Sequence, residues 1–340
     1  MNIKTIGLDT AKTIFHLVGL NQHGKQVLKK KLRRSQLLTY FANLPPCTIA
    51  IEGCASAHYW KRELIKLGHR VKLLPAQHVK AYVRGNKNDY NDALALAEAS
   101  RVPEMREVTP KTIDQQSIQA LHRLRESATG DRTALSNQLR GLLAEFGIIF
   151  PKGIKHIKGG LYGVLEDAEN DLTHSLRAAL ALKHAQFVQL DDLVRELKQL
   201  INESSEAHQE IGLLQSAPGY GEILSSAFYS VIGDGTAFAK GRDASASLGV
   251  VPRQHSTGDK TVLLGISKRG DSYLRKMLIN GARSVVNHAH KKDDALSVWV
   301  TQLVARRGKN KATVALANKL ARIGWAIITS GKPYEENYAV

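Results

Sequence analysis

Three short strand-forming runs lie within the first 32 positions of the chain. They cover residues 3–9, 14–20 and 25–32, and turn-forming residues such as Asn21 and Gly24 separate the second run from the third. Runs of this length with turn residues between them are typical of antiparallel strands that follow one another as a meander. The start of the chain therefore predicts a three-stranded sheet, which needs further elements to cover its apolar side chains.

Strands and helices alternate after this meander. Residues 47–53 favour a buried strand, 57–67 a helix that ends at Gly68, and 69–75 a further strand. Parallel strands need such crossover helices between them. The pattern therefore predicts an α/β fold with a mixed sheet and helices on both faces, which is the ribonuclease-H-like arrangement.

Long helical patterns follow the α/β region. Apolar residues recur at helical spacing from Lys111 to Phe146, and from Leu176 to Ile201 they alternate by three and four, which is typical of a coiled-coil seam. Such a seam fits either an internal hairpin or a contact between subunits. The predicted parts are a carboxylate domain at 1–108, a helical linker at 109–208, a mainly helical domain at 209–332 and a tail at 333–340.

The charge of the chain favours nucleic acid as a partner. Lysine and arginine number 48 against 31 aspartates and glutamates, which gives a formal charge of +17. Residues 260–332 carry 15 of the basic residues and only three acidic ones. A surface with this surplus repels itself unless a polyanion neutralises it.

Cysteine usage and apolar runs narrow the class of protein further. Only Cys47 and Cys54 occur, and neither is spaced with the thirteen histidines as in a zinc site, which disfavours zinc knuckles and disulfide frameworks. No signal segment and no run of membrane-spanning length is evident. We therefore expect a cytoplasmic protein with no membrane partner.

Two features suggest contacts with DNA or RNA. One is a set of arginines between the apolar positions of the first long helix, for which a solvated face is the alternative: Arg123, Arg125, Arg132 and Arg140. The other is the turn Pro218-Gly219-Tyr220-Gly221, which resembles a helix-hairpin-helix. Gly219 and Gly221 would let backbone N–H groups approach a phosphate, although an ordinary turn between helices explains them equally well.

Four carboxylates lie at the ends of predicted elements. Asp9 ends the first strand and Glu52 the fourth, while Asp89 and Asp92 open a helix and share one of its faces. Such a cluster repels itself unless divalent cations lie within it, and its oxygen ligands suit Mg²⁺ or Mn²⁺. Two metal ions can stabilise the attacking and leaving oxygens of a phosphoryl displacement. Taken alone, Asp89 or Asp92 is also explained as a helix N-cap and Asp9 as a loop residue.

The segments around these carboxylates carry a resemblance to a known family. They are Ile6-Gly7-Leu8-Asp9-Thr10-Ala11-Lys12, Ile51-Glu52-Gly53 and Lys87-Asn88-Asp89-Tyr90-Asn91-Asp92-Ala93. Together they are similar to the three blocks of the DEDD transposases of bacterial insertion sequences, in the IS110 family and its IS1111 branch. The resemblance continues through residues 249–258, 265–271 and 274–275, and so spans nearly the whole chain.

This resemblance implies a first domain of the RuvC-like type and a serine nucleophile that forms a transient phosphoserine link to DNA. It also implies a structured guide RNA from the element's own non-coding end, and dimers that pair into a tetramer. Ser256 is our choice for the nucleophile, because a primary hydroxyl is less hindered at phosphorus than the β-branched Thr257. Counting strictly from Pro252 selects Thr257 instead, and without the resemblance both residues are explained as a polar turn before Gly258.

Basic residues around this segment are placed to orient or neutralise the phosphate, although a general electrostatic role is the simpler interpretation of each. They are Arg253, His255, Lys268, Arg269 and Arg275.

The leading hypothesis is an RNA-guided recombinase that cuts and rejoins DNA, since a guide RNA removes the need for a recognition helix. A Holliday-junction resolvase or ribonuclease-H-like hydrolase would use the carboxylates and water, which leaves residues 210–330 unexplained. A nucleic-acid-binding protein without activity accounts for the charge but not for the four carboxylates.

Overall fold

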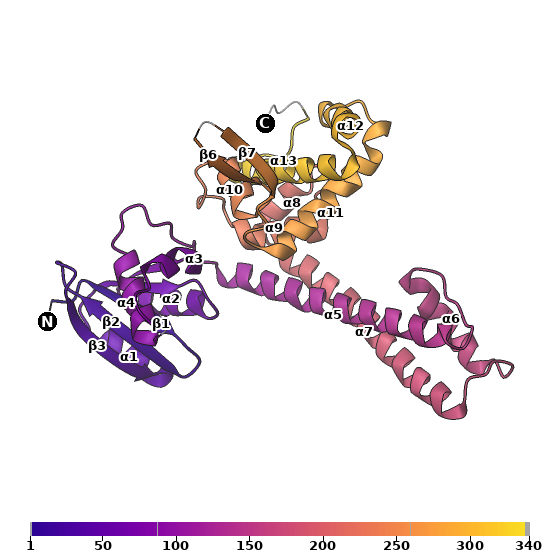
Figure 1. The fold of residues 1–340 in the computed structure, drawn as a ribbon, viewed down its shortest axis with the longest axis horizontal. Helices are drawn as coiled ribbons and strands as arrows, with labels where there is room; N and C mark the ends of the chain where they lie inside the picture. The colour runs from indigo at the N-terminus through magenta and orange to yellow at the C-terminus, as the bar shows by residue number, and fades with distance from the viewer. Residues whose placement is uncertain (1, 87, 259, 337–340) are drawn as a thin grey trace. The chain divides into compact units, whose positions relative to one another are not determined.

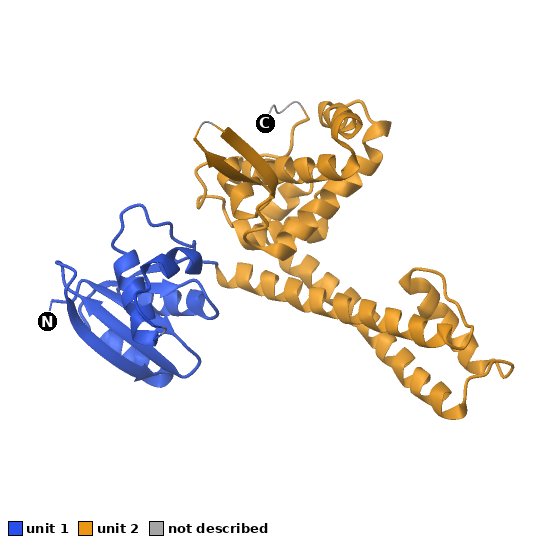
Figure 2. Cartoon of the chain, in the orientation of Figure 1, with its two compact units in different colours: residues 1–111 blue, residues 112–340 orange. Residues whose placement is uncertain are grey.

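A computed structural model of the chain describes residues 2–86, 88–258 and 260–336. The chain divides into two compact units, Met1–Lys111 and Thr112–Val340, which are coloured separately in Figure 2. The finer division expected at residues 108, 208 and 332 stays a prediction. Residues 337–340 of the expected tail, and Lys87 of the third carboxylate block, lie outside the described residues.

The first unit is built on a five-stranded sheet. Its strands are β1 (Thr5–Thr10), β2 (Ile14–Leu20), β3 (Gln26–Arg33), β4 (Thr48–Glu52) and β5 (Arg70–Leu74). They lie in the order β3-β2-β1-β4-β5, with the first three antiparallel and β4 and β5 parallel to β1 (Figure 1). The predicted mixed α/β sheet is therefore confirmed, and β1 is its central strand.

Both faces of this sheet carry helical segments. These are η1 (Arg34–Gln36), α1 (Leu37–Ala42), α2 (Ala57–Lys66), α3 (Ala76–Val79), η2 (Lys80–Tyr82) and α4 (Asp89–Ala99). On one face, Phe41 of α1 and Trp60 of α2 pack against Leu8 in the main core of the unit. On the other face, Ala93 of α4 packs against Val18. Alternate residues of the central strands therefore face different helices.

Two long helices form an antiparallel hairpin in the second unit. They are α5 (Ile113–Ala144) and α7 (His174–Glu206), and α6 (Ile154–Glu166) packs near the end of the pair (Figure 1). On α7 the buried residues Leu180, Phe187, Val194 and Ile201 recur every seven positions. The first three belong to apolar clusters shared with α5. The sequence left open whether this seam joins two helices of one chain or two subunits. In the structure it joins two helices of one chain.

The rest of the second unit is mostly helical, as expected. Its helices are α8 (Gln209–Leu214), α9 (Glu222–Ile232), α10 (Gly241–Ser247), α11 (Ser272–His288), η3 (Ala289–Lys291), α12 (Ala295–Arg307) and α13 (Lys309–Ser330). Buried residues such as Phe228, Leu278 and Leu320 join them into one core. Among the described helices none has the length and apolar character needed to cross a membrane.

One β-hairpin interrupts this helical region. It consists of β6 (Pro252–Thr257) and β7 (Lys260–Ile266), which pair antiparallel. All of its residues that the structure describes are exposed except Ile266, which is half-buried. The sequence pattern predicted a mainly helical region here, so this β-hairpin is an addition to the predicted fold.

Candidate active site

Gly7 determines how closely α4 approaches the central strand. Ile6 and Leu8 of β1 are fully buried toward α1 and α2, so Gly7 and Asp9 face α4 on the other side. A Cβ atom at Gly7 would lie 1.8 Å from the backbone oxygen of Ala93, which no side chain can do. The helix therefore lies directly on the strand, and its first turn is brought close to Asp9.

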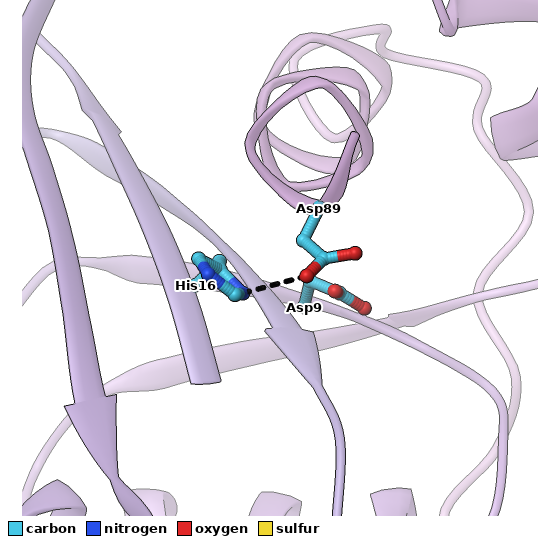
Figure 3. Close-up of side chains that lie close together, drawn as sticks. All are labelled: Asp9, His16 and Asp89. Carbon is cyan, nitrogen blue, oxygen red and sulfur yellow. Dashed lines mark ion pairs between the residues drawn. The ribbon is translucent and has the colours of Figure 1, made fainter. Parts of the chain in front are cut away.

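Asp89 reaches Asp9 from the first turn of this helix. Asn88 caps the helix, since its side chain accepts a hydrogen bond from the Tyr90 backbone N–H at 2.9 Å. One potential ligand atom from each of Asp9, His16 and Asp89 lies within 4.8 Å of the other two (Figure 3). Two of the four predicted carboxylates thus meet a histidine that the sequence analysis did not identify.

His16 enters the site through the pairing of β1 with β2. It lies opposite Asp9 in the antiparallel register, and its Nδ1 atom is 3.3 Å from Oδ2 of Asp89. This Nδ1 is buried and has no hydrogen-bond partner among the described residues. The Tyr90 ring packs edge-on against the imidazole with the ring centroids 4.7 Å apart, which holds its orientation.

The other two predicted carboxylates act on Asp9 through their charge. Burial is the largest cause of a pKa of about 6 for Asp9, and the charges of Asp89 and Asp92 raise this pKa further. His16 lowers the pKa, and Glu52 adds a smaller increase. Glu52 follows Ile51, which pairs with Leu8, so it ends the strand beside Asp9. All four carboxylates therefore influence one position, although only Asp9 and Asp89 belong to the compact cluster with His16.

This arrangement suits a divalent cation. The carboxylates repel one another in a partly buried place. The adjoining Nδ1 of His16 has no hydrogen-bond partner in the described part of the chain. A bound cation would relieve this repulsion and would satisfy the nitrogen. Carboxylate oxygens are the ligands that Mg²⁺ and Mn²⁺ share, and imidazole is a ligand of transition metals.

The two candidate nucleophiles lie on β6 of the exposed hairpin. Successive side chains of a strand point to opposite faces, so Ser256 shares a face with Gln254 and Thr257 shares the other with His255. The Gln254 side-chain amide donates to Ser256 Oγ at 2.8 Å. Both hydroxyls are exposed to solvent, and the geometry of the strand gives each one a different set of neighbours.

Known protein families match both the region of the carboxylate cluster and the region of the β6–β7 hairpin. A family model described as a transposase, of the DEDD type of IS110 elements, matches residues 6–148, and one described as "Transposase IS116/IS110/IS902 family" matches residues 212–296. The transposase for insertion sequence element IS1111A of Coxiella burnetii is 39% identical over 333 residues, covering 98% of this chain and 92% of the relative. A probable family 20 transposase of Pseudomonas aeruginosa is 43% identical and covers 97% and 98%. The transposase for IS1328 of Yersinia enterocolitica is 40% identical and covers 98% and 99%.

The chain belongs to the IS110 family of transposases. At this general level it is an enzyme that cleaves and rejoins DNA, and the family implies that it binds DNA. The family also suggests a divalent metal, in agreement with the cluster of Asp9, His16 and Asp89.

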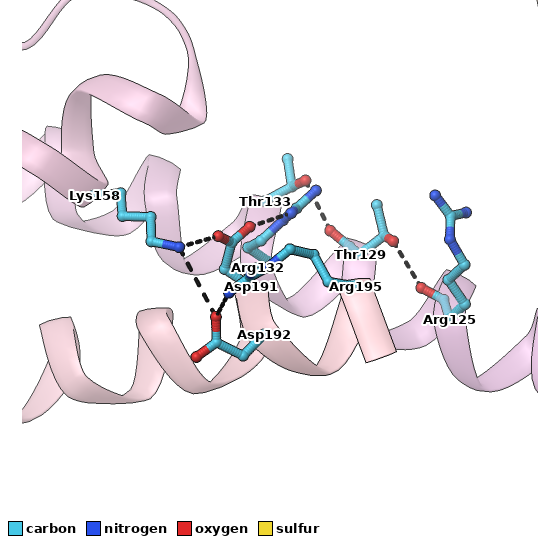
Figure 4. Close-up of polar contacts among 8 residues, drawn as sticks. All are labelled: Arg125, Thr129, Arg132, Thr133, Lys158, Asp191, Asp192 and Arg195. Carbon is cyan, nitrogen blue, oxygen red and sulfur yellow. Dashed lines mark hydrogen bonds and ion pairs between the residues drawn. The ribbon is translucent and has the colours of Figure 1, made fainter. Parts of the chain in front are cut away.

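Two of the α5 arginines proposed as nucleic-acid contacts of this transposase instead join α5 to neighbouring parts of the second unit. Asp191 of α7 pairs with Arg132 of α5 at 2.6 Å and with Lys158 of α6 at 2.5 Å (Figure 4). The hydrogen bond from Lys158 is the largest cause of a lowered pKa for Asp191. Arg140 donates to the backbone oxygen of Gly153 at 2.6 Å.

The four arginines do not share one exposed face. Arg125 is half-buried and interacts with the Tyr273 side chain, and Arg132 and Arg140 are also half-buried. Arg123 is exposed, because it projects from the opposite side of α5. Of the four, Arg123 is therefore the one that takes no part in the contacts described above.

The glycine turn of the transposase packs against a helix. Gly219 has a φ of +85°, and a Cβ there would lie 3.0 Å from the backbone oxygen of Gly281 on α11. A Cβ at Gly281 would lie 2.4 Å from the Gly219 oxygen, so the two glycines permit a close backbone contact. Gly221 is the N-cap of α9 and has open space around it. The structure thus gives Gly219 a packing role, while Gly221 faces no neighbour.

The basic residues in and near the β6–β7 hairpin differ in their exposure to solvent. Arg253, His255, Lys268 and Arg269 are exposed. Arg275 is half-buried, and its Nη1 donates to the backbone oxygens of Leu248 at 3.2 Å and Arg269 at 2.9 Å. Arg275 therefore fixes the segment that carries Arg269.

Proposed function

We propose that this transposase moves its insertion sequence by a covalent recombination in which the carboxylate cluster and a serine act on the same phosphodiester. The observation that carries this proposal is the cluster of Asp9, His16 and Asp89, with Asp92 and Glu52 acting on Asp9 through their charge. Its position at the end of a central strand supports the further proposal that the first unit is RuvC-like.

Asp9, Glu52, Asp89 and Asp92 would hold the divalent cation, Mg²⁺ or Mn²⁺, with His16 beside them. When bound, the cation supplies positive charge that stabilises the phosphate oxygens during displacement. The chain's own task is to hold the carboxylates in place, and the close contact of α4 with β1 at Gly7 does this.

Ser256 would attack the phosphorus of the DNA backbone. The bond from its Oγ to phosphorus forms as the bond from phosphorus to a sugar oxygen breaks, and the serine loses a proton while the sugar oxygen gains one. The reverse exchange with a new DNA end restores the serine and joins the strands. A covalent link conserves the bond energy that hydrolysis would lose. Thr257 is the alternative nucleophile on the same strand.

The proposed partners are DNA at the element's ends and target, and a structured guide RNA that selects these sites by base pairing. The formal charge of +17 supports binding to both polyanions. We further propose assembly as dimers that pair into tetramers, in the bacterial cytoplasm and associated with the nucleoid.

Incubation of the transposase with labelled DNA, guide RNA and Mg²⁺, followed by a denaturing gel, tests the proposal. A DNA band retarded by covalently attached protein is the expected result, and Asp9→Ala should abolish it. Free nicks without an adduct would favour a resolvase or ribonuclease-H-like hydrolase, and no change in the DNA would favour a binding protein. Cleavage by Asp9→Ala at the rate of the unmodified protein would contradict the metal-site assignment.

A further inference from the structure

A basic hollow of about 700 Å³ lies in the first unit, away from the carboxylates. Nine residues line it, among them Lys12, Arg33, Arg34, Tyr59 and Trp60. Phe15 of β2 belongs to the core beneath this side of the sheet, whereas the adjacent residue His16 faces the carboxylates. The hollow is lined in part from α1 and α2, which cover one face of the sheet, whereas the carboxylate cluster lies on the face that α4 covers.

The charge around the hollow is entirely positive. Lys12, Arg33 and Arg34 are exposed, and none of the nine lining residues is acidic. The ion pairs found among the described residues of the first unit involve other side chains. Three cations that have no carboxylate partner within the described part of the chain, gathered around one hollow, favour an anionic ligand.

Aromatic side chains adjoin these cations. The Arg34 guanidinium lies 4.8 Å from the centroid of the Trp60 ring, and Tyr59 packs edge-on against Trp60 at 5.0 Å. Tyr59 is 40% exposed, so part of its ring is available to a ligand. Trp60 is only 2% exposed, and its indole N–H has no hydrogen-bond acceptor among the residues that the structure describes. The exposed part of the Tyr59 ring is therefore the aromatic surface that the hollow offers to a ligand.

We propose that this hollow binds a single-stranded segment of nucleic acid, with a phosphate among the cations and a base stacked on Tyr59. Duplex DNA offers phosphates but keeps its bases stacked inside, so it would leave the aromatic ring unused. Single strands offer both groups, and proteins bind them by combining basic grooves with aromatic stacking. The inference rests on the proposed function only in that the transposase handles DNA and RNA.

Photocrosslinking of the full chain tests this site without any cleavage. Oligonucleotides of about eight nucleotides that carry 5-iodouracil, as RNA and as DNA in separate arms, are irradiated with the protein in EDTA, and crosslinked peptides are identified by mass spectrometry. We expect an adduct on Tyr59 or Trp60 from at least one single strand and a much weaker one from a duplex. The arm with the higher yield identifies the source of the strand.

Variants separate this site from the other basic surfaces. Tyr59→Ala should lower the yield at this peptide about ten-fold, which corresponds to the loss of one stacked base, and Tyr59→Phe should restore it. Lys12→Gln with Arg33→Gln should also lower it. The matched controls Tyr162→Ala and Lys25→Gln replace exposed residues outside the hollow and should leave the yield unchanged.

Two results would overturn the inference. One is the absence of adducts on Tyr59 and Trp60 while other peptides crosslink. The other is displacement of the oligonucleotide by poly-glutamate as effectively as by unlabelled oligonucleotide, which would assign the hollow to an acidic peptide. A protein that crosslinks here but leaves DNA uncut would retain this inference and lose the proposed recombination.

Discussion

Asp9 on β1 lies directly opposite His16 on β2 in the antiparallel register of the two strands. Paired residues of neighbouring strands point to the same face, so a carboxylate and an imidazole meet where α4 adds Asp89. An imidazole beside carboxylates influences which metal binds, because nitrogen is a poor ligand for Mg²⁺ and a better one for transition metals.

His16→Asn is therefore expected to weaken Mn²⁺ binding about ten-fold, measured by titration calorimetry, and to change Mg²⁺ binding little. Pulsed electron paramagnetic resonance of the Mn²⁺-loaded protein should detect a coupled nitrogen nucleus that the variant lacks. His23→Asn is the control, since His23 is exposed in the turn after β2. Nitrogen coupling that persists in His16→Asn would exclude this residue as a ligand.

Gly7→Ala should destabilise the first unit. The new methyl group would overlap the Ala93 backbone, so α4 must move away from β1 at a cost of about 2 kcal/mol or more. Urea unfolding measures the change, and DNA cleavage should fall with it because Asp89 moves with the helix. Gly130→Ala in α5 is the control, because a Cβ there meets no atom within 4 Å and should stabilise the helix by about 1 kcal/mol. Equal effects from the two substitutions would contradict the packing argument.

Ser256→Ala should keep DNA and RNA binding but lose the covalent adduct, whereas Thr257→Ala should keep appreciable activity. Both side chains are exposed, so neither substitution should disturb folding. Mass spectrometry of the trapped adduct identifies the residue that carries the phosphate. Phosphate on Thr257 would reverse our choice of nucleophile. His255, which lies on the same face of β6 as Thr257, would then be the histidine nearest to the nucleophile along that face.

His122 should make the second unit less stable in acid. Its Nδ1 lies 3.0 Å from the Tyr273 hydroxyl and its Nε2 3.0 Å from Ser226 Oγ, and burial, followed by the charge of Arg125, lowers its pKa to about 4. The unfolded chain binds this proton near its ordinary pKa of 6.5. Between these values the unfolded state holds more protons, so stability falls as pH falls from 6.5 to 4, by about 3 kcal/mol.

The variant His122→Gln should be less stable at pH 7 but should lose this part of the pH dependence, measured by urea unfolding at several pH values. His58 in the first unit also has a pKa lowered to about 4, mainly by burial. It is present in both the unmodified protein and the variant, so it does not account for a difference between them. The same slope in both proteins would show that His122 does not stay neutral in the folded state.

Arg132 should contribute to the stability of the second unit, whereas Arg123 should not. Arg132→Gln removes one of the two cations that bind Asp191, and we expect a loss of about 1–3 kcal/mol in stability. Arg123→Gln should leave stability within about 0.5 kcal/mol. If Arg123 contacts a phosphate, its loss should reduce the slope of log affinity against log salt by about one. Equal unfolding free energies for the two variants would contradict the assignment of Arg132 to the hairpin.

Much of the first unit could be predicted because its strands are short, apolar and separated by turn residues. The carboxylates could be predicted as a group because Asp9 and Glu52 end neighbouring strands. His16 was missed because its place depends on the register of β2 against β1, which the spacing of residues does not give directly. Counting seven residues from Asp9 across a tight turn would have placed it opposite.

The second unit shows where sequence patterns were insufficient. The strand pair β6 and β7 was missed, although Gly258 and Asp259 separate two strand-forming runs, a spacing typical of hairpins. The arginines of α5 were grouped on one face, whereas the helix turns about 100° per residue and places Arg123 and Arg132 on opposite sides. Contacts with Asp191 could not be anticipated, because α7 lies about 60 residues further along the chain.

Leu180, Phe187, Val194 and Ile201 recur every seven residues, so the helical hairpin can change its length in steps of seven residues without a change in its packing. Removal or insertion of seven residues in each of α5 and α7, at matched levels, changes its reach by about 10 Å and returns every apolar side chain to the seam. Changes of two or three residues would rotate the seam out of register instead. We therefore expect the α5–α7 hairpins of relatives to differ in length by whole heptads, while the carboxylate cluster and the β6–β7 hairpin stay unchanged.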